Sequence, residues 1–195
     1  MTLTINFKKL VALINPVLFM FYFKQVRFYL VNRKNISIKH FSLSIDKSFF
    51  FNFHGNGKLC LGKKICIKNG VEIEVFENAL VEIGNNFFIN MNSSIISRYG
   101  IKIGDNCMIG KMVSIYDHNH CFEITEQPFN QQGFYGSPII IGNNVWIGSG
   151  VFIGQGVHIG DSVVIGANAV ITKSIPSYSL VHSNLGLITK KLSHT

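Results

Sequence analysis

The sequence lacks the features that mark several common classes of protein. Its four cysteines form no CxxC pair, and we interpret them as small buried hydrophobic residues in a reducing compartment. The apolar run over residues 10–23 is too short to span a bilayer, and no small-residue cleavage site follows it. Acidic residues are few, at 10 against 18 Lys and Arg, so the formal charge of +8 indicates an anionic partner. No nucleic-acid-binding motif accompanies this charge, which favours phosphates, an acidic sugar polymer or a membrane surface.

The N-terminal 58 residues are expected to form a non-repetitive cap, part of it helical. The apolar run is preceded and followed by basic side chains, namely Lys8, Lys9, Lys24, Arg27, Arg33 and Lys34. Two interpretations stay open: a helix that packs on the subunit, or an amphipathic segment on the inner surface of the membrane. We therefore expect a cytoplasmic protein, peripheral at the inner face of the membrane under the second interpretation.

A six-residue repeat dominates the C-terminal half of the chain. An aliphatic residue returns at every sixth position, and the series is Ile141, Ile147, Ile153, Ile159, Ile165 and Ile171. Neither an amphipathic helix nor an alternating strand has this period. A prism with one short strand on each side does have it, and stacked coils of such a prism form a parallel β-helix. The sequence therefore predicts an all-β solenoid in which equivalent isoleucines pile into a continuous core.

The predicted β-helix domain covers residues 59–176 and is followed by a tail over 177–195. Three hexads make a coil of about 18 residues, so some five to six coils are expected. The largest interruption of the repeat is the loop 116–138, which contains Asp117, His118 and His120. A loop of this length without structure of its own is usually functional.

Four segments resemble a known family. They are FFINMNSSI (87–95), SIYDHNH (114–120), PIIIGNNVWIGSGVFI (138–153) and VIGANAVITKSIP (164–176). They resemble the hexapeptide-repeat acyltransferases, in particular the galactoside/maltose O-acetyltransferase branch and relatives that O-acetylate bacterial polysaccharides such as sialic acid capsules. The resemblance implies a left-handed parallel β-helix and a homotrimer with active sites between subunits. It also implies acetyl-CoA as co-substrate and no requirement for a metal.

The same resemblance assigns roles to individual residues. His118 matches the catalytic histidine of the protruding loop, and Asn90 matches a contact to the acceptor sugar. Trp146 matches a tryptophan at the active-site cleft. Positions along the groove for coenzyme A are Trp146, Ser149, Ala167, Thr172 and Lys173, and Lys190 is a further candidate for its phosphates. Where the galactoside branch has acidic residues, this chain has Arg98, which suits an acceptor with a carboxylate. Tyr116 and Asp117 are also predicted to lie at the acceptor.

The chemistry itself points to a histidine base. Transfer of an acetyl group to a sugar hydroxyl requires removal of the hydroxyl proton, for which a neutral imidazole is suited near pH 7. His118 is the first candidate, and His120 is the alternative base or an acceptor contact. Asp117 could orient an imidazole, although adjacent residues rarely present their side chains to each other.

The hexad pattern also places Trp146. Since Val145 and Ile147 point inward, Trp146 should point outward and serve as a ligand platform or an interface residue. An 18-residue coil puts His118 and Trp146 near different edges of the prism. One active site is therefore expected to draw them from different subunits.

Other functions on this fold are less consistent with the sequence. A γ-type carbonic anhydrase needs three histidines that converge on zinc, and no third His lies at a coil spacing from His118 and His120. An ice-binding solenoid would show regular rows of Thr. The nearest alternative is an N-acetyltransferase for an amino-sugar nucleotide or an antibiotic. We therefore predict an acetyl-CoA-dependent O-acetyltransferase for a saccharide, in particular a sialic acid-containing or other acidic capsular or surface polysaccharide.

Overall fold

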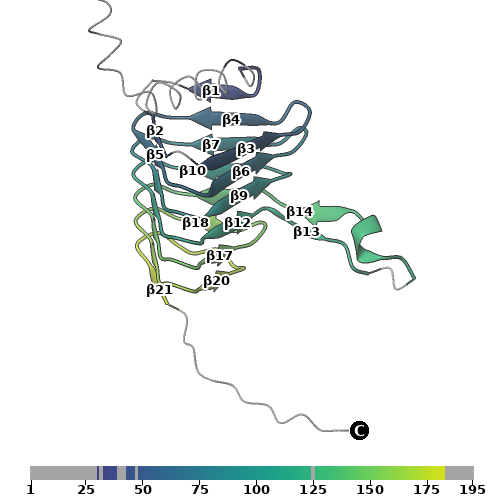
Figure 1. Ribbon diagram of the computed structural model, residues 1–195. Coiled ribbons are helices and arrows are strands. Elements are labelled where there is room, and N and C mark those ends of the chain that lie inside the picture. Colours follow the sequence, from purple (N-terminus) through teal and green to yellow (C-terminus); the bar gives the residue numbers. More distant parts are fainter. Residues whose placement is uncertain (1–29, 31–32, 39–42, 47, 124–125, 183–195) are drawn as a thin grey trace, which may run out of the picture.

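The computed structural model describes residues 30, 33–38, 43–46, 48–123 and 126–182 (Figure 1). The expected N-terminal helix over the apolar run and the candidate Lys190 lie outside these residues. In this part of the chain, no helix is both long and apolar enough to cross a bilayer.

Three parallel sheets form the sides of a prism, and a two-stranded hairpin projects from it (Figure 1). Sheet 1 consists of β1 (Ile36–Ile38), β4 (Lys58–Leu61), β7 (Leu80–Ile83), β10 (Ile101–Ile103), β15 (Ile139–Ile141) and β18 (His158–Ile159). Sheet 2 consists of β2 (Leu43–Ile45), β5 (Ile65–Ile67), β8 (Phe88–Ile89), β11 (Met108–Ile109), β16 (Trp146–Ile147), β19 (Val164–Ile165) and β21 (Leu180–Val181). Sheet 3 consists of β3 (Phe49–Phe53), β6 (Val71–Val75), β9 (Ser94–Ser97), β12 (Ser114–Tyr116), β17 (Phe152–Ile153) and β20 (Val170–Ile171).

Apart from the hairpin, consecutive strands go to different sheets, so each coil up to β18 contributes one strand to each side. This is the parallel β-helix predicted from the hexads, and it is consistent with the left-handed form that the family resemblance implies. The inward isoleucines stack in register, as in the pairs Ile109 with Ile147 and Ile147 with Ile165. These side chains are fully buried, and each contributes about 1.5–3 kcal/mol through removal of apolar surface from water. The repeat therefore supplies a rigid core, and function depends on what points outward.

The β-helix begins at β1, within the segment that the sequence assigned to a non-repetitive cap. Strands β1, β2 and β3 pair with β4, β5 and β6 and form a complete first coil. The early coils are longer than the late ones: Leu59 pairs with Val81, 22 residues later, whereas Ile141 pairs with Ile159, 18 residues later. The extra residues lie in longer strands: β3 and β6 span five residues and β4 spans four, whereas the late strands β17 and β18 span two each. They break the strict six-residue spacing, so the first coil shows no clear hexads.

The interruption at 116–138 has structure of its own. Strand β13 (His118–His120) pairs antiparallel with β14 (Phe134–Gly136), and the short 3₁₀ helix η1 (Phe129–Gln131) lies between them. Figure 1 shows this hairpin projecting from the side of the prism, well away from the axis of the coils. The hairpin carries His118 at its base, next to the edge where sheet 3 meets sheet 1.

Candidate active site

The centre of the candidate site is a pair of adjacent side chains, Asp117 and His118. The Nδ1 atom of His118 lies 3.0 Å from Oδ1 of Asp117. An ionised carboxylate can only accept a hydrogen bond, so Nδ1 of the neutral imidazole carries the proton and Nε2 has the free lone pair. The His118 side chain is 12% exposed, so it borders solvent. In this arrangement the lone pair of Nε2 is free to accept a proton.

Asp117 is anchored from the inside of the β-helix. Its side chain is 0% exposed and accepts hydrogen bonds from the hydroxyl of Ser97 and from the backbone N–H groups of Arg98, Tyr99 and Gly100, at 2.7–2.9 Å. Burial alone would raise the pKa of Asp117. The hydrogen bonds from His118, the two backbone groups of Arg98 and Gly100, and the Ser97 hydroxyl outweigh it and hold this pKa below its ordinary value. Asp117 therefore stays ionised and orients His118; contact with an acceptor, as predicted from the sequence, is inconsistent with its complete burial.

Arg98 lies between two phenylalanine rings. Its Cζ atom is 3.5 Å from the ring centroid of Phe76, which follows β6, and 3.7 Å from that of Phe134 in the hairpin. Both faces of the guanidinium are therefore covered, and only its edge is open to a ligand. The same two rings approach the imidazole of His118, with centroid distances of 6.3 Å for Phe76 and 5.4 Å for Phe134.

His120 and Tyr116 take peripheral places around this pair. His120 is exposed and its ring contacts Phe134 at a centroid distance of 4.3 Å. The Tyr116 hydroxyl lies on the outer face of sheet 3, 2.9 Å from the hydroxyl of Ser94. Between the two histidines, His118 is the one with a carboxylate partner among the described residues, which favours it as the base.

The other predicted site residues lie along two edges of the prism, which we name after the sheets they join. Thr172 and Lys173 follow β20, so they lie on the 3–1 edge, as does His118 after β12. Asn90, Ser149 and Ala167 lie on the 2–3 edge, where a Ser149 hydroxyl accepts a hydrogen bond from the backbone of Lys111. The side-chain oxygen of Asn90 accepts from the N–H of Met91, which is a turn role. A strand of sheet 3 separates the two edges by about 10 Å in each coil.

Trp146 points outward from sheet 2, as predicted, and is 54% exposed. It stands in a column of outward apolar side chains, paired in register with Met108 on one side and Val164 on the other, and Leu180 follows Val164. Met108 and Leu180 are 50% and 71% exposed. Within the described chain, Trp146 lies on sheet 2 and His118 on the 3–1 edge. That one active site combines them from different subunits stays a prediction.

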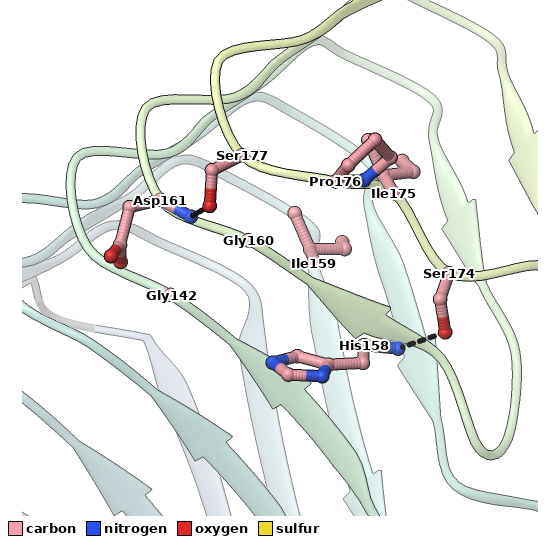
Figure 2. A pocket seen from close by; sticks show the side chains of 9 residues that line it. All are labelled: Gly142, His158, Ile159, Gly160, Asp161, Ser174, Ile175, Pro176 and Ser177. Atoms are coloured by element: carbon pink, nitrogen blue, oxygen red, sulfur yellow. Dashed lines mark hydrogen bonds between the residues drawn. The ribbon is translucent and has the colours of Figure 1, made fainter.

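A separate hollow of about 480 Å³ lies near the C-terminal end of the β-helix (Figure 2). Figure 2 shows that it is lined by His158, Asp161 and the turn that contains Ser174, Pro176 and Ser177. The backbone N–H of His158 donates to the Ser174 hydroxyl, and that of Asp161 donates to the Ser177 hydroxyl. The two serine hydroxyls thus tie the turn to the chain at His158 and Asp161. None of the predicted site residues lines the hollow.

The hairpin returns to the β-helix at Gly136. A Cβ atom at this position would overlap the carbonyl oxygen of Asp117 and come within 2.6 Å of the Tyr99 ring. The backbone N–H of Ser137 donates to that same carbonyl oxygen, at 3.0 Å. The absence of a side chain at Gly136 therefore lets the hairpin pack against the residue that orients His118.

Replacement of Gly136 by Ala is expected to displace the hairpin base and to lower kcat roughly ten- to hundredfold, because small displacements of a catalytic group are costly. The measurement is acetyl-CoA-dependent activity, with thermal unfolding as a check on the fold. Ser137→Ala, at the exposed neighbouring position, is the matched control and should retain activity. Unchanged kcat in Gly136→Ala would show that this contact does not position the site.

The repeats match known families. Residues 138–173 match the family described as bacterial transferase hexapeptide (six repeats), and residues 80–111 and 99–115 match the hexapeptide repeat of succinyl-transferase. Galactoside O-acetyltransferase of Escherichia coli (strain K12) is 44% identical over 96 residues, which are 49% of this chain and 46% of that protein. The chain thus spans less than half the length of the curated relatives it matches.

Solved structures agree with this placement. A maltose O-acetyltransferase from Clostridium difficile 630 is 29% identical, with a TM-score of 0.54 over 84% of this chain and 74% of that one. A variant of the N-acyltransferase AntD from Bacillus cereus, in complex with dTDP and coenzyme A, has a TM-score of 0.65 over 82% of this chain and 84% of that one. At 18% identity, AntD supports the fold alone. The chain carries transferase-type hexapeptide repeats. The resemblance to the galactoside and maltose O-acetyltransferases is confirmed.

Several residues of the site were not predicted from the sequence. Ser97 anchors Asp117, and Phe76 and Phe134 enclose Arg98. His54 stacks on Phe76 at a centroid distance of 4.3 Å and an interplanar angle of 5°. The sequence holds a signal for the stack of His54, Phe76 and Arg98, because each of these residues directly follows the strand that its coil gives to sheet 3.

Proposed function

We propose that this protein is an acetyl-CoA-dependent O-acetyltransferase that acts on a hydroxyl of a saccharide. The observation that carries the proposal is the Asp117–His118 pair, a buried carboxylate that fixes the tautomer of a partly exposed imidazole on the rim of a transferase-type β-helix. The similarity to galactoside and maltose O-acetyltransferases supports the reaction class.

His118 would act on the acceptor as its general base. The acceptor oxygen forms a bond to the thioester carbonyl carbon while Nε2 of His118 takes the hydroxyl proton. The carbon–sulfur bond then breaks, and the proton passes to the departing thiolate, so that no other reactant is consumed. Asp117 keeps Nδ1 protonated and stabilises the imidazolium that forms in between.

Coenzyme A would be held by small and basic residues at the edges of the prism. Ser149 and Ala167 are exposed on the 2–3 edge, and Thr172 and Lys173 are exposed on the 3–1 edge. Small side chains leave room for an extended ligand, and the ammonium of Lys173 suits a phosphate. Lys190 is a further candidate for the phosphates from the sequence alone.

We propose that the working unit is a homotrimer. Its support is the placement of His118 and Trp146 on different parts of the prism, together with the exposed apolar column of Met108, Trp146 and Leu180 on sheet 2. Large exposed apolar side chains in one row are typical of an interface. A second subunit would cover this column and complete the site next to His118.

The acceptor we would test first is an acidic glycan, such as a sialic acid-containing capsular or surface polysaccharide. The net charge of +8 supports it. Arg98 supports it less than expected, because both faces of its guanidinium are covered. The described cysteines are all free thiols, which is consistent with a reaction in the reducing cytoplasm. Peripheral contact with the inner face of the membrane through the N-terminal segment remains part of this proposal.

An acceptor screen tests the function. Purified protein is incubated with acetyl-CoA and sialic acid polymers, neutral oligosaccharides, amino-sugar nucleotides or aminoglycoside antibiotics, and release of the free thiol is followed. We expect thiol release and an ester product with a saccharide. The His118→Ala variant is the matched control and should release little thiol. Activity confined to amine acceptors would overturn O-acetylation in favour of an N-acetyltransferase, and no thiol release with any acceptor would overturn both.

Complementation tests the shared site. His118→Ala and Trp146→Ala are each expected to lower activity strongly as pure proteins. Unfolded together and refolded as mixed trimers, they should regain up to about one quarter of wild-type activity, because about one quarter of the sites would combine an intact His118 with an intact Trp146 from another subunit. No recovery in verified mixed trimers would place both residues of a site on one subunit.

A further inference from the structure

We propose that Arg98 is a positioning residue: its guanidinium clamps the hairpin onto the edge of the β-helix and thereby fixes the imidazole of His118. The kinetic part of this inference rests on the proposed function, whereas its structural part does not. The sequence suggested a different role for Arg98, namely direct contact with a carboxylate of the acceptor.

The clamp joins two parts of the chain that no β-ladder connects. Phe76 belongs to the second coil, directly after β6, and Phe134 begins the return strand of the hairpin. The Arg98 guanidinium lies between them, at 3.5 Å and 3.7 Å from the two ring centroids. A planar cation over an aromatic face is attracted by the ring quadrupole, and the attraction grows as water is excluded. Arg98 therefore holds the hairpin to the coil through both of its faces.

The rings that hold Arg98 are also those that contact the histidines. Phe134 lies 5.4 Å from the His118 ring with an edge-on geometry of 74°, and 4.3 Å from the His120 ring. Phe76 approaches His118 edge-on at 6.3 Å. Movement of either ring would change the walls around the imidazole, so the guanidinium acts on His118 through them.

Arg98 also reaches the catalytic pair through its backbone. Its N–H donates to Oδ1 of Asp117, the same oxygen that receives Nδ1–H of His118. Since every substitution at Arg98 except proline keeps this N–H, a side-chain variant changes the clamp and leaves the anchor of Asp117 in place. The two contributions of the residue can therefore be separated.

The surroundings of the guanidinium favour a clamp over an acceptor ligand. Its Nε atom is buried and has no hydrogen-bond partner among the residues described, so stacking holds the group. Burial lowers the pKa of Arg98, and the charges of Glu74 and Asp117 oppose this shift. The guanidinium thus already lies in the field of two carboxylates of this chain. The carboxylate of Glu74 is further tied to His54, whose Nε2 lies 2.7 Å from it and whose ring extends the stack beyond Phe76.

The experiment compares Arg98→Met, Arg98→Lys and a control, Lys102→Met, which removes an exposed cation from the outer face of sheet 1. Hydrogen exchange of the hairpin amides at 118–120 and 134–136 reports the clamp, and steady-state kinetics report its effect on catalysis. For Arg98→Met we expect exchange about tenfold faster in the hairpin and kcat about tenfold lower, the size expected for loss of a desolvated cation–π contact. KM for acetyl-CoA should not change.

Arg98→Lys keeps a cation at the rings without the planar group and should recover part of both losses. Lys102→Met should match the wild type in both readouts. Unchanged hairpin exchange in Arg98→Met, or a rise in KM for the acceptor with kcat unaltered, would overturn the clamp and support direct acceptor contact. If the wild type transfers no acetyl group, the hydrogen-exchange result alone still decides for or against the clamp, so the two proposals fail separately.

Discussion

Replacing His118 with alanine is expected to lower kcat by roughly 10²- to 10⁴-fold, which is the usual contribution of a positioned general base. The loss follows from the geometry: Nδ1 of His118 is held by Asp117, so the variant removes the imidazole that a buried carboxylate orients at the base of the hairpin. KM for acetyl-CoA should change little, because the base acts on the acceptor hydroxyl. The measurement is initial-rate thiol release at saturating acetyl-CoA.

The control for this prediction is His120→Ala. His120 lies two residues away in the same strand, is exposed and contacts Phe134, so its removal changes the surroundings of the site without removing the oriented base. We expect a loss of about tenfold or less, which corresponds to a weak aromatic contact. A larger loss for His120→Ala than for His118→Ala would show that the assignment of the base is wrong.

The fold could be predicted from the sequence because the late coils are strictly periodic. Over 141–171 each hexad ends one strand and begins the next, and the inward isoleucines stack without insertions. The first coil was not predicted because its inward side is partly aromatic, with Phe51 in the core, and because its strand β3 is five residues long instead of two. A prediction based on a fixed period fails where the coil length changes.

The site could be predicted only in part. His118 was found because it lies in the interruption of the repeat. Its pairing with Asp117 was not expected, because adjacent side chains point to opposite faces along a regular strand. At Asp117 the chain leaves sheet 3, between β12 and β13, and the carboxylate turns inward while remaining within 3.0 Å of His118.

The meeting of both phenylalanine rings at Arg98 could not be predicted from the sequence. Phe76 and Phe134 are 58 positions apart in the sequence, and neither belongs to a hexad or to a segment that resembles the family. Their meeting depends on the exact length of the coil between Phe76 and Arg98 and on how the hairpin folds back. Contacts of this kind follow from tertiary packing, which periodicity does not encode.

Asp117→Asn is the second prediction with a large expected effect. The variant keeps the size of the side chain but loses the charge that fixes Nδ1–H of His118, so we expect kcat to fall by roughly 10²-fold or more. It also loses stability at neutral pH, by about 3 kcal/mol, because a buried amide cannot accept all the hydrogen bonds that the carboxylate receives from Ser97 and three backbone N–H groups. Both effects are measured on the same protein, by kinetics and by urea unfolding.

The pH dependence separates this prediction from a general loss of packing. The pKa of Asp117 in the folded protein is held below its ordinary value of 3.8, which the unfolded chain approaches. Its contribution to the free energy of unfolding is therefore fully present above that ordinary value and is lost as the pH falls through the lower folded-state pKa. The wild type should lose stability below about pH 4 by this route, whereas Asp117→Asn should not, so the difference between them narrows in acid.

The matched control is Asp46→Asn. Asp46 is an acid of the same type whose ion pair with Lys68, at 3.7 Å, lies on the surface, where such a pair is worth about 0–1 kcal/mol. Its loss should leave kcat unchanged and the stability near that of the wild type. If the gap between the wild type and Asp117→Asn stayed constant down to pH 2, the stabilising charge would lie elsewhere. If Asp117→Asn had the kcat of the wild type, the carboxylate would have no role in catalysis. Its role would then be to anchor the turn 98–100.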